Sequence, residues 1–200
     1  MIKILNKNSF APYKVFYDFL ETAQKNNQTA IDAICISSFN KNDNEVDARY
    51  VNLKYVDNQD WIFFSNYNGK KAQDFQSHSQ INATLYWSSI DLQIRMKAKI
   101  RRTSKEFSDM HFQSRDIKKN ALAIISNQSE QIKSYEEVVK RYNSFLNKKD
   151  NSKIVRPVHW GGFSFCPYYF EFWEGHKSRI NKRNIFELTN GSWTNSILQP

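Results

Sequence analysis

The sequence predicts an α+β fold, in which a closed or nearly closed antiparallel β-barrel has helices packed outside it. Five short segments rich in β-branched and aromatic residues come first, a helical middle follows, and three more strand-like segments end the chain. The 200 residues are 40% apolar and 15% aromatic. Because such a chain can fill one large core, we expect a single domain over residues 1–200.

An amphipathic helix is expected after Pro12, and the polar stretch Lys25–Gln28 ends it. Its apolar face consists of five residues at helical spacing, Val15, Phe16, Phe19, Leu20 and Ala23. Polar turns then separate five expected strands, Ile31–Phe39, Ala48–Val56, Trp61–Ser65, Ile81–Trp87 and Leu92–Ile100. Between the third and fourth strands, Ala72 and Phe75 predict a short helix over Lys70–Ser77.

The middle of the chain predicts two or three helices, because Thr103–Glu106 and Ser134–Glu137 both have the pattern of a capping box. Strands are expected to return after Pro157, at Phe163–Trp173, Arg179–Leu188 and Trp193–Leu198. Asn190-Gly191 predicts a tight hairpin turn between the last two strands.

The net charge of +9 suits nucleic acid, an acidic membrane surface or a phosphorylated ligand. Basic residues occur in short scattered groups, such as Lys70–Lys71 and Arg101–Arg102, which argues against nucleic acid. No apolar run has membrane length and no secretory signal is recognisable, so we expect a cytoplasmic protein without membrane contact. Cys35 and Cys166 match no metal or redox motif and are expected to be buried free thiols.

Five motifs carry most of the functional information in the sequence. They are the strand-like Arg49–Lys54, the strand–loop–helix segment Phe64–Ala72, the WGGF motif His159–Phe163, the EFW motif Phe170–Trp173 and the segment Arg179–Arg183 with two spaced arginines. In order and spacing they resemble the pyridoxamine 5′-phosphate oxidase family over about residues 10–200. The resemblance implies an FMN-binding split barrel, and a homodimer with the flavin at the interface between the subunits.

The resemblance also implies the positions that line the cofactor. They are Arg49, Tyr50, Val51, Asn52, Leu53, Lys54, Phe64, Ser65, Lys70, Lys71, Gln93, Gln128, Ser129, Trp173 and Arg183. This set makes physical sense, because a phosphate group with about two negative charges requires charge-assisted donors from Arg and Lys. The flavin ring needs polar groups beside its carbonyls and ring nitrogens.

The reaction implied by the resemblance is oxidation of pyridoxamine or pyridoxine 5′-phosphate to pyridoxal 5′-phosphate, with oxygen as acceptor. Lys54 and Arg115 match the family's ligands of the substrate phosphate, and Arg179 matches the arginine over the substrate ring. Three positions depart from the family: His111 replaces a tyrosine, Lys119 a serine and Asn181 a histidine.

The departures have unequal weight. His111 and Lys119 can still bind a phosphate, whereas Asn181 cannot gain or lose a proton near neutral pH. Arg179 and Asn181 are the expected catalytic pair. Two alternatives stay open: a flavin oxidoreductase of the same fold acting on another heterocycle, and a non-catalytic protein that binds flavin or pyridoxal phosphate. No metal site is expected.

Overall fold

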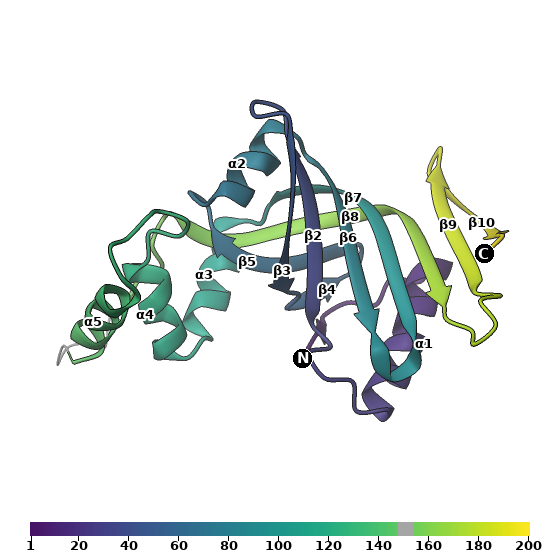
Figure 1. Cartoon of the computed structure of the whole chain (residues 1–200), viewed down its shortest axis with the longest axis horizontal. Coiled ribbons are helices and arrows are strands. Elements are labelled where there is room, and N and C mark those ends of the chain that lie inside the picture. Colours follow the sequence, from purple (N-terminus) through teal and green to yellow (C-terminus); the bar gives the residue numbers. More distant parts are fainter. Residues whose placement is uncertain (148–153) are drawn as a thin grey trace.

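The computed structural model describes residues 1–147 and 154–200. Ten strands in these residues form one curled sheet with the order β1-β4-β5-β8-β7-β6-β2-β3, and β9 and β10 extend it from β8 (Figure 1). The strands are β1 (Lys3–Ile4), β2 (Ala33–Asn40), β3 (Glu45–Asn52), β4 (Tyr55–Asp57), β5 (Asp60–Asn66), β6 (Gln80–Trp87), β7 (Leu92–Arg102), β8 (Trp160–Glu174), β9 (Lys182–Thr189) and β10 (Ser192–Leu198).

The expected barrel is thus an open half-barrel. The sheet order ends at β1 and β3 without joining them, and β1 pairs with β4 in parallel while the other pairs are antiparallel. The helices are α1 (Ala11–Lys25), α2 (Lys70–Ser77), the 3-10 turn η1 (Ser88–Ile90), α3 (Lys105–Gln113), α4 (Ile117–Ile125) and α5 (Tyr135–Leu146). Figure 1 shows α3, α4 and α5 together at one end of the sheet and the β9–β10 hairpin at the other.

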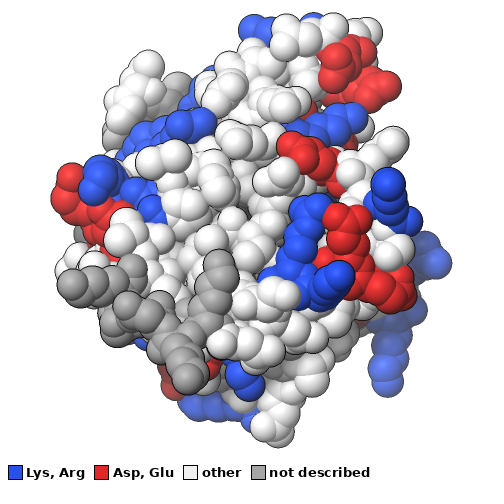
Figure 2. All heavy atoms as spheres, turned by 90° about the vertical axis from the view of Figure 1, so that its left-hand side faces the viewer, with Lys and Arg blue, Asp and Glu red and all other residues white. Residues whose placement is uncertain are grey.

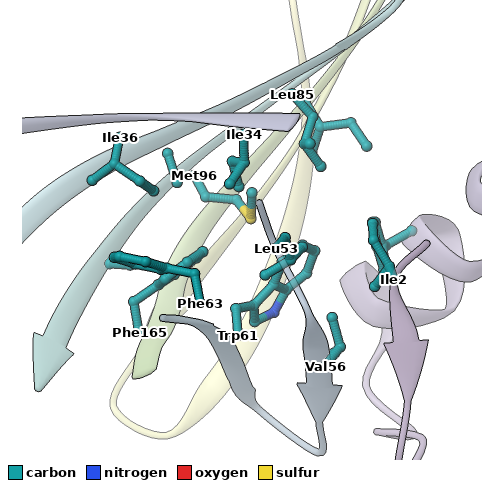
Figure 3. Close-up of a cluster of buried hydrophobic side chains, with 14 of the residues drawn as sticks. Ile2, Ile34, Ile36, Leu53, Val56, Trp61, Phe63, Leu85, Met96 and Phe165 are labelled. Carbon is teal, nitrogen blue, oxygen red and sulfur yellow. The ribbon is translucent and has the colours of Figure 1, made fainter. Parts of the chain in front are cut away.

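The core lies inside the curl of the sheet and is closed by α1. Figure 3 shows apolar side chains from several strands meeting there, among them Ile34 of β2, Trp61 of β5 and Phe165 of β8. Phe16 of α1 packs against Trp61 with ring centroids 4.4 Å apart. Since each fully buried large apolar side chain stabilises the fold by about 1.5–3 kcal/mol, this cluster holds the half-barrel in its curved shape.

The predicted strand Ala48–Val56 is divided in two. After β3 the chain leaves β2: the Leu53 N–H donates to the Asp32 carbonyl at 2.7 Å and the Lys54 N–H donates to the Ile62 carbonyl at 2.8 Å. Tyr55 and Val56 then pair with β5 as β4. Leu53, at this transition, points into the core and is fully buried (Figure 3).

Other predicted boundaries were wrong as well; the strand expected at Phe163–Trp173, for example, begins at Trp160. The helix α3 is capped by Ser104, whose hydroxyl accepts from the Phe107 N–H at 3.1 Å, and Thr103 instead bonds the Ser108 hydroxyl. The strand expected from Arg179 begins at Lys182, because Arg179 has a left-handed φ of 60° in a turn. The Asn190-Gly191 hairpin is confirmed: both residues have positive φ, as a type I′ turn requires.

The two glycines of the WGGF motif allow close approach of other elements to β8. A Cβ at Gly161 would collide with the Tyr67 ring, and one at Gly162 would lie 2.5 Å from the Thr103 hydroxyl. Tyr67 donates from its hydroxyl to the Gly162 carbonyl at 3.2 Å. The motif therefore lets the loop before α2 and the start of α3 pack directly on the strand.

Among the described residues, no helix combines the length and the apolar character needed to cross a membrane. Both Cys35 and Cys166 are free thiols, as expected, but they are half-buried rather than buried.

Candidate functional site

A groove opens between the edge strand β3, the strand β5 and the helices α3 and α4. It has two adjoining parts, of about 500 Å³ and about 160 Å³. The larger part is lined by Arg49, Tyr50, Val51, Asn52, Lys54, Phe64, Ser65, Lys71, His111, Arg115, Lys119, Gln128 and Trp160. The smaller part shares six of these residues and adds Asn66, Leu122, Ala123 and Ser126. The groove falls within the size range of small-molecule sites.

The edge strand β3 forms one wall of the groove. Because β3 ends the sheet order, its backbone groups on the side away from β2 have no strand partner among the described strands and can bond a ligand. Along β3, Arg49 and Val51 are half-buried, whereas Tyr50 between them is 73% exposed. The alternation of a strand thus places Arg49 against α2 and leaves Tyr50 at the rim.

At one end of the groove, Arg49 and Lys71 come together from β3 and α2. The guanidinium of Arg49 donates to Asp47 at 2.6 Å and to the buried Asp74 at 3.1 Å. Lys71 donates to the Gln128 side-chain oxygen at 3.2 Å. Burial lowers the pKa of Lys71, and the nearby charge of Arg49 lowers it further. Asp47 and Asp74 balance part of this charge, and the partly desolvated Lys71 beside Arg49 still favours an anionic ligand.

The other end of the groove is built around His111 and Arg115. The His111 ring stacks on Phe64, with ring centroids 3.6 Å apart, and its Nδ1 lies 2.8 Å from the Tyr55 hydroxyl. The Arg115 guanidinium lies 4.3 Å above the Trp160 ring and donates to the Lys119 carbonyl at 3.2 Å. The second terminal nitrogen of Arg115, Nη1, is buried and has no hydrogen-bond partner within the described residues.

Burial lowers the pKa of His111 to about 4, and the charges of Arg115, Lys54 and Lys3 add to the effect. His111 is therefore neutral at pH 7. Lys54 reaches the same end of the groove and pairs with Asp32 at 3.0 Å. A neutral imidazole beside cationic groups can donate or accept one hydrogen bond without adding charge.

The electrostatic character of the groove is strongly basic. Among the described residues its lining includes five cationic residues, Arg49, Lys54, Lys71, Arg115 and Lys119, and no carboxylate. Carboxylates outside the lining pair with two of them, Arg49 and Lys54. On the side of the molecule that carries α3–α5, Lys and Arg lie beside Asp and Glu and form no continuous basic surface (Figure 2). The concentration of positive charge in the groove is thus local, and it suits a ligand with more than one anionic group.

Three of the predicted cofactor residues lie away from the groove but next to each other. Gln93, Trp173 and Arg183 are register partners on β7, β8 and β9. Arg183 donates from Nε to the buried Glu171 at 2.8 Å, and Arg95 pairs with the same carboxylate at 3.1 Å. This second cluster lies toward the β9 end of the sheet, opposite to α3–α5 (Figure 1).

The predicted catalytic pair belongs to the same region. Arg179 and Asn181 lie in the exposed turn between β8 and β9. The side-chain oxygen of Asn181 accepts from the His176 N–H at 3.0 Å, which leaves the amide nitrogen available as a donor. Within a single chain, these two residues do not line the groove that contains Lys54, His111, Arg115 and Lys119.

Three further predicted cofactor residues lie at or beyond the margin of the groove. Lys70 points to Glu45, 3.4 Å away, and Ser129 lines an adjoining hollow of about 300 Å³ beside α5, which shares Gln128 with the groove. The Leu53 side chain is in the core, so that only its backbone can face a ligand. The remaining cofactor residues that the motifs Arg49–Lys54 and Phe64–Ala72 predicted all line the groove.

Sequence reasoning missed several residues that shape the groove. Trp160 was recognised as part of the WGGF motif. Its position beneath the Arg115 guanidinium was not predicted. Tyr55 was expected to be an ordinary strand residue, yet it holds His111. Asp74 gave no signal at all, because a single acidic residue in a short helix is usually exposed.

Comparisons with known proteins show which family the chain is similar to. A family model described as pyridoxamine 5′-phosphate oxidase matches residues 20–146, and one described as the pyridoxine 5′-phosphate oxidase C-terminal dimerisation region matches residues 160–200. The pyridoxine/pyridoxamine 5′-phosphate oxidase of Nostoc sp. is 34% identical, covering 98% of this chain and 90% of that protein. The protein of the same name from Trichormus variabilis is 34% identical, covering 94% and 88%.

Two solved structures share the fold. PhzG from Burkholderia lata, in complex with tetrahydrophenazine-1-carboxylic acid, superposes with a TM-score of 0.89 at 18% identity, covering 98% of this chain and all of that one. A pyridoxamine 5′-phosphate oxidase-related, FMN-binding protein from Nostoc punctiforme gives a TM-score of 0.79 at 12% identity, covering 96% and 100%. At these identities the likeness concerns the fold alone.

Proposed function

Because the chain belongs to the pyridoxamine 5′-phosphate oxidase family, we propose that it is an FMN-dependent oxidase of phosphorylated B6 vitamers. It converts pyridoxamine or pyridoxine 5′-phosphate to pyridoxal 5′-phosphate, with oxygen as acceptor. The observation that carries the proposal is the groove with five cationic side chains, in which a buried nitrogen of Arg115 has no partner among the described residues. An unsatisfied charged donor of this kind favours an anionic ligand.

The residues of the groove fit FMN. Arg49 and Lys71 are suited to its phosphate, and the free backbone edge of β3 is suited to the sugar chain and the ring. Ser65 donates to the Gln128 side-chain oxygen at 3.2 Å, so both offer polar atoms at one rim. The other proposed contacts of this protomer are Tyr50, Val51, Asn52, the Leu53 backbone, Lys54, Phe64, Lys70 and Ser129.

The second cluster suggests a homodimer in which each subunit completes the other's site. Gln93, Trp173 and Arg183 are proposed to approach the flavin ring from the partner subunit, together with Arg179 and Asn181. All of these except Gln93 lie in residues 160–200, the part that matches the dimerisation region. With a twofold axis, the β9 end of each chain would lie at the groove of the other chain. The dimer would then contain two identical sites.

Mixed dimers test this arrangement. Arg115→Leu damages the groove and Arg183→Gln damages the second cluster, so each variant alone is expected to have low activity. In a refolded equal mixture, half of the dimers are mixed, and each mixed dimer has one undamaged site. Activity is expected to return to about a quarter of the wild-type value. If the mixture is no more active than the mean of the two single variants, the two subunits do not share their sites.

The chemistry of the reaction comes from FMN, which when bound supplies the acceptor for a hydride. The protein positions the substrate. Lys54, Arg115 and Lys119 are proposed to bind the phosphate of the vitamer, and neutral His111 donates a further hydrogen bond to it. Phe64 and Trp160 exclude water from this end of the groove. Holding the reacting carbon in place can contribute about 7–11 kcal/mol in well-oriented systems.

Arg179 is proposed to cover the substrate ring from the partner subunit. Asn181 can donate from its amide nitrogen to a substrate hydroxyl, because its oxygen is already used by the His176 N–H. It cannot take up or release a proton near neutral pH. Any proton transfer at this place therefore has to occur through another group or through water.

The proposed function predicts a yellow protein that is active on phosphorylated vitamers. Purified protein is expected to show the visible spectrum of bound flavin, and to form aldehyde and hydrogen peroxide when pyridoxamine 5′-phosphate is added in air. Dephosphorylated pyridoxamine, as control, should react far more slowly, because the cationic groove has no phosphate to bind. Colourless protein that cannot be reconstituted with FMN would disprove the proposal.

A second candidate is an FMN-dependent oxidase of the same fold that acts on another anionic heterocycle. Asn181 and Lys119 favour it, since both depart from the family pattern at the substrate positions. The structural neighbour PhzG was solved with tetrahydrophenazine-1-carboxylic acid, an anionic heterocycle without phosphate. Bound flavin without turnover of either B6 phosphate would favour this candidate, or a non-catalytic binding protein, over the first.

A further inference from the structure

A buried carboxylate lies behind the end of the groove that Arg49 and Lys71 form. Asp74, on the inner face of α2, is only 1% exposed. Its Oδ2 accepts from the Ser38 hydroxyl at 2.7 Å and from Arg49 Nη2 at 3.1 Å, and its Oδ1 accepts from Asn40 Nδ2 at 3.1 Å. Asp74 thus ties one helix, α2, to two strands, β2 and β3.

Arg49 is held in one orientation by this network. Its Nη1 donates to the Ser38 hydroxyl at 2.7 Å and to the Ile36 carbonyl at 3.2 Å. The other carboxylate on Arg49 belongs to Asp47, whose side chain is 44% exposed and can move into solvent. Because hydrogen bonds to buried charged groups are stronger than exposed ones, Asp74 is the firmer of the two anchors.

The position of Lys71 depends on the same carboxylate, because Lys71 and Asp74 belong to the same helix, α2. Lys71 precedes Asp74 by three residues, so both lie on one side of α2. Asp74 faces inward between β2 and β3, while Lys71 reaches the groove beside Arg49. The position of the first turn of α2 relative to β3 is therefore set in part by the contact between Asp74 and Arg49.

We propose that Asp74 is a positioning residue for the cofactor phosphate, which holds Arg49 and the first turn of α2 so that Arg49 and Lys71 face the same phosphate group. The inference rests on the proposed function, in that FMN occupies the groove. Asp74 does not touch the cofactor; it acts through Arg49 and Lys71.

An amide cannot replace this carboxylate. Three donors converge on the two oxygens of Asp74, from Ser38, Asn40 and Arg49. The side chain of asparagine has one acceptor oxygen and an NH₂ group, so Asp74→Asn sets a donor against at least one of these donors. The substitution also removes the negative charge that faces the guanidinium of Arg49, so the contact that holds Arg49 beside Lys71 is weakened.

The experiment titrates apoprotein with FMN and with riboflavin, and measures quenching of flavin fluorescence. Riboflavin has no phosphate, so it reports on the rest of the site. Asp74→Asn is expected to weaken FMN binding about tenfold and to leave riboflavin binding unchanged. Asp74→Glu, which keeps the charge and both acceptor oxygens, is expected to restore most of the affinity for FMN.

Asp60→Asn serves as a matched control. Asp60 also accepts from an arginine and a serine, Arg101 at 2.8 Å and Ser164 at 2.7 Å, but it lies outside the groove. This variant is expected to bind both flavins as the wild type does. If Asp74→Asn does not fold, Ser38→Ala removes one contact of Asp74 and one of Arg49, and is expected to weaken FMN binding selectively by a smaller factor.

Each outcome distinguishes the two claims. Equal losses for FMN and riboflavin would make Asp74 a structural residue only, and unchanged or tighter FMN binding would show that it does not position the phosphate. Either result overturns the inference while leaving the proposed function intact. Failure of the wild-type apoprotein to bind FMN would instead overturn the proposed function.

Discussion

Replacing Arg115 with leucine is expected to lower kcat/KM for pyridoxine 5′-phosphate about 100-fold. Charge-assisted hydrogen bonds contribute about 1.5–3 kcal/mol each, and the buried Arg115 Nη1 has no partner in the part of the chain that the structure describes. The loss should appear mainly in KM, because the phosphate is bound equally before and during the reaction. Steady-state kinetics with the phosphorylated substrate check this prediction.

The same substitution should leave the fold nearly as stable as before, to within about 1 kcal/mol. Leucine loses the contact of the guanidinium with the Trp160 ring, but it also removes a buried donor for which residues 1–147 and 154–200 offer no partner. Arg141→Leu on α5 is the control, since Arg141 pairs with Glu137 on the same helix and lies outside the groove. A change of less than threefold in kcat/KM for Arg115→Leu would show that Arg115 does not bind the phosphate.

His111 is expected to make the apoprotein less stable as the pH falls from about 6.5 to 4. Burial lowers the pKa of His111 to about 4 in the fold, against 6.5 in the unfolded chain. Between these pH values the His111 imidazole is protonated in the unfolded chain but stays neutral in the folded protein. Protonation therefore favours unfolding. The contribution is fully present above pH 6.5, and about 2–3 kcal/mol is lost toward pH 4.

His111→Phe isolates this effect. Phenylalanine keeps the stack on Phe64 and cannot titrate, although it leaves the Tyr55 hydroxyl without its partner. Urea unfolding at several pH values should therefore show a lower stability at pH 7 but a flatter decline between pH 6.5 and 4.5. His176→Gln provides a control, because His176 is exposed to solvent. This variant should follow the wild-type profile of stability against pH. Parallel profiles for His111→Phe and wild type would contradict the assignment.

Local patterns predicted most secondary structure in this chain. The short helix Lys70–Ser77 was predicted with its observed bounds, because its apolar spacing and its turn residues act within a few residues of each other. The Asn190-Gly191 hairpin is fixed locally for the same reason. Ala48–Val56 was predicted as one strand, whereas the structure has two, β3 and β4. The break depends on hydrogen bonds from Leu53 to Asp32 and from Lys54 to Ile62, which are distant in sequence.

The sequence by itself determined the order of elements, the family and the residue types that face an anionic ligand, because motif spacing and side-chain chemistry are local properties. Only the tertiary structure decided which of those residues meet. Folding joins Arg49, Lys71 and Arg115 in one groove, buries Asp74 behind Arg49, and leaves Trp173 and Arg183 at the far end of the sheet. Such contacts follow from how the sheet curls around its core, which no short stretch of sequence contains.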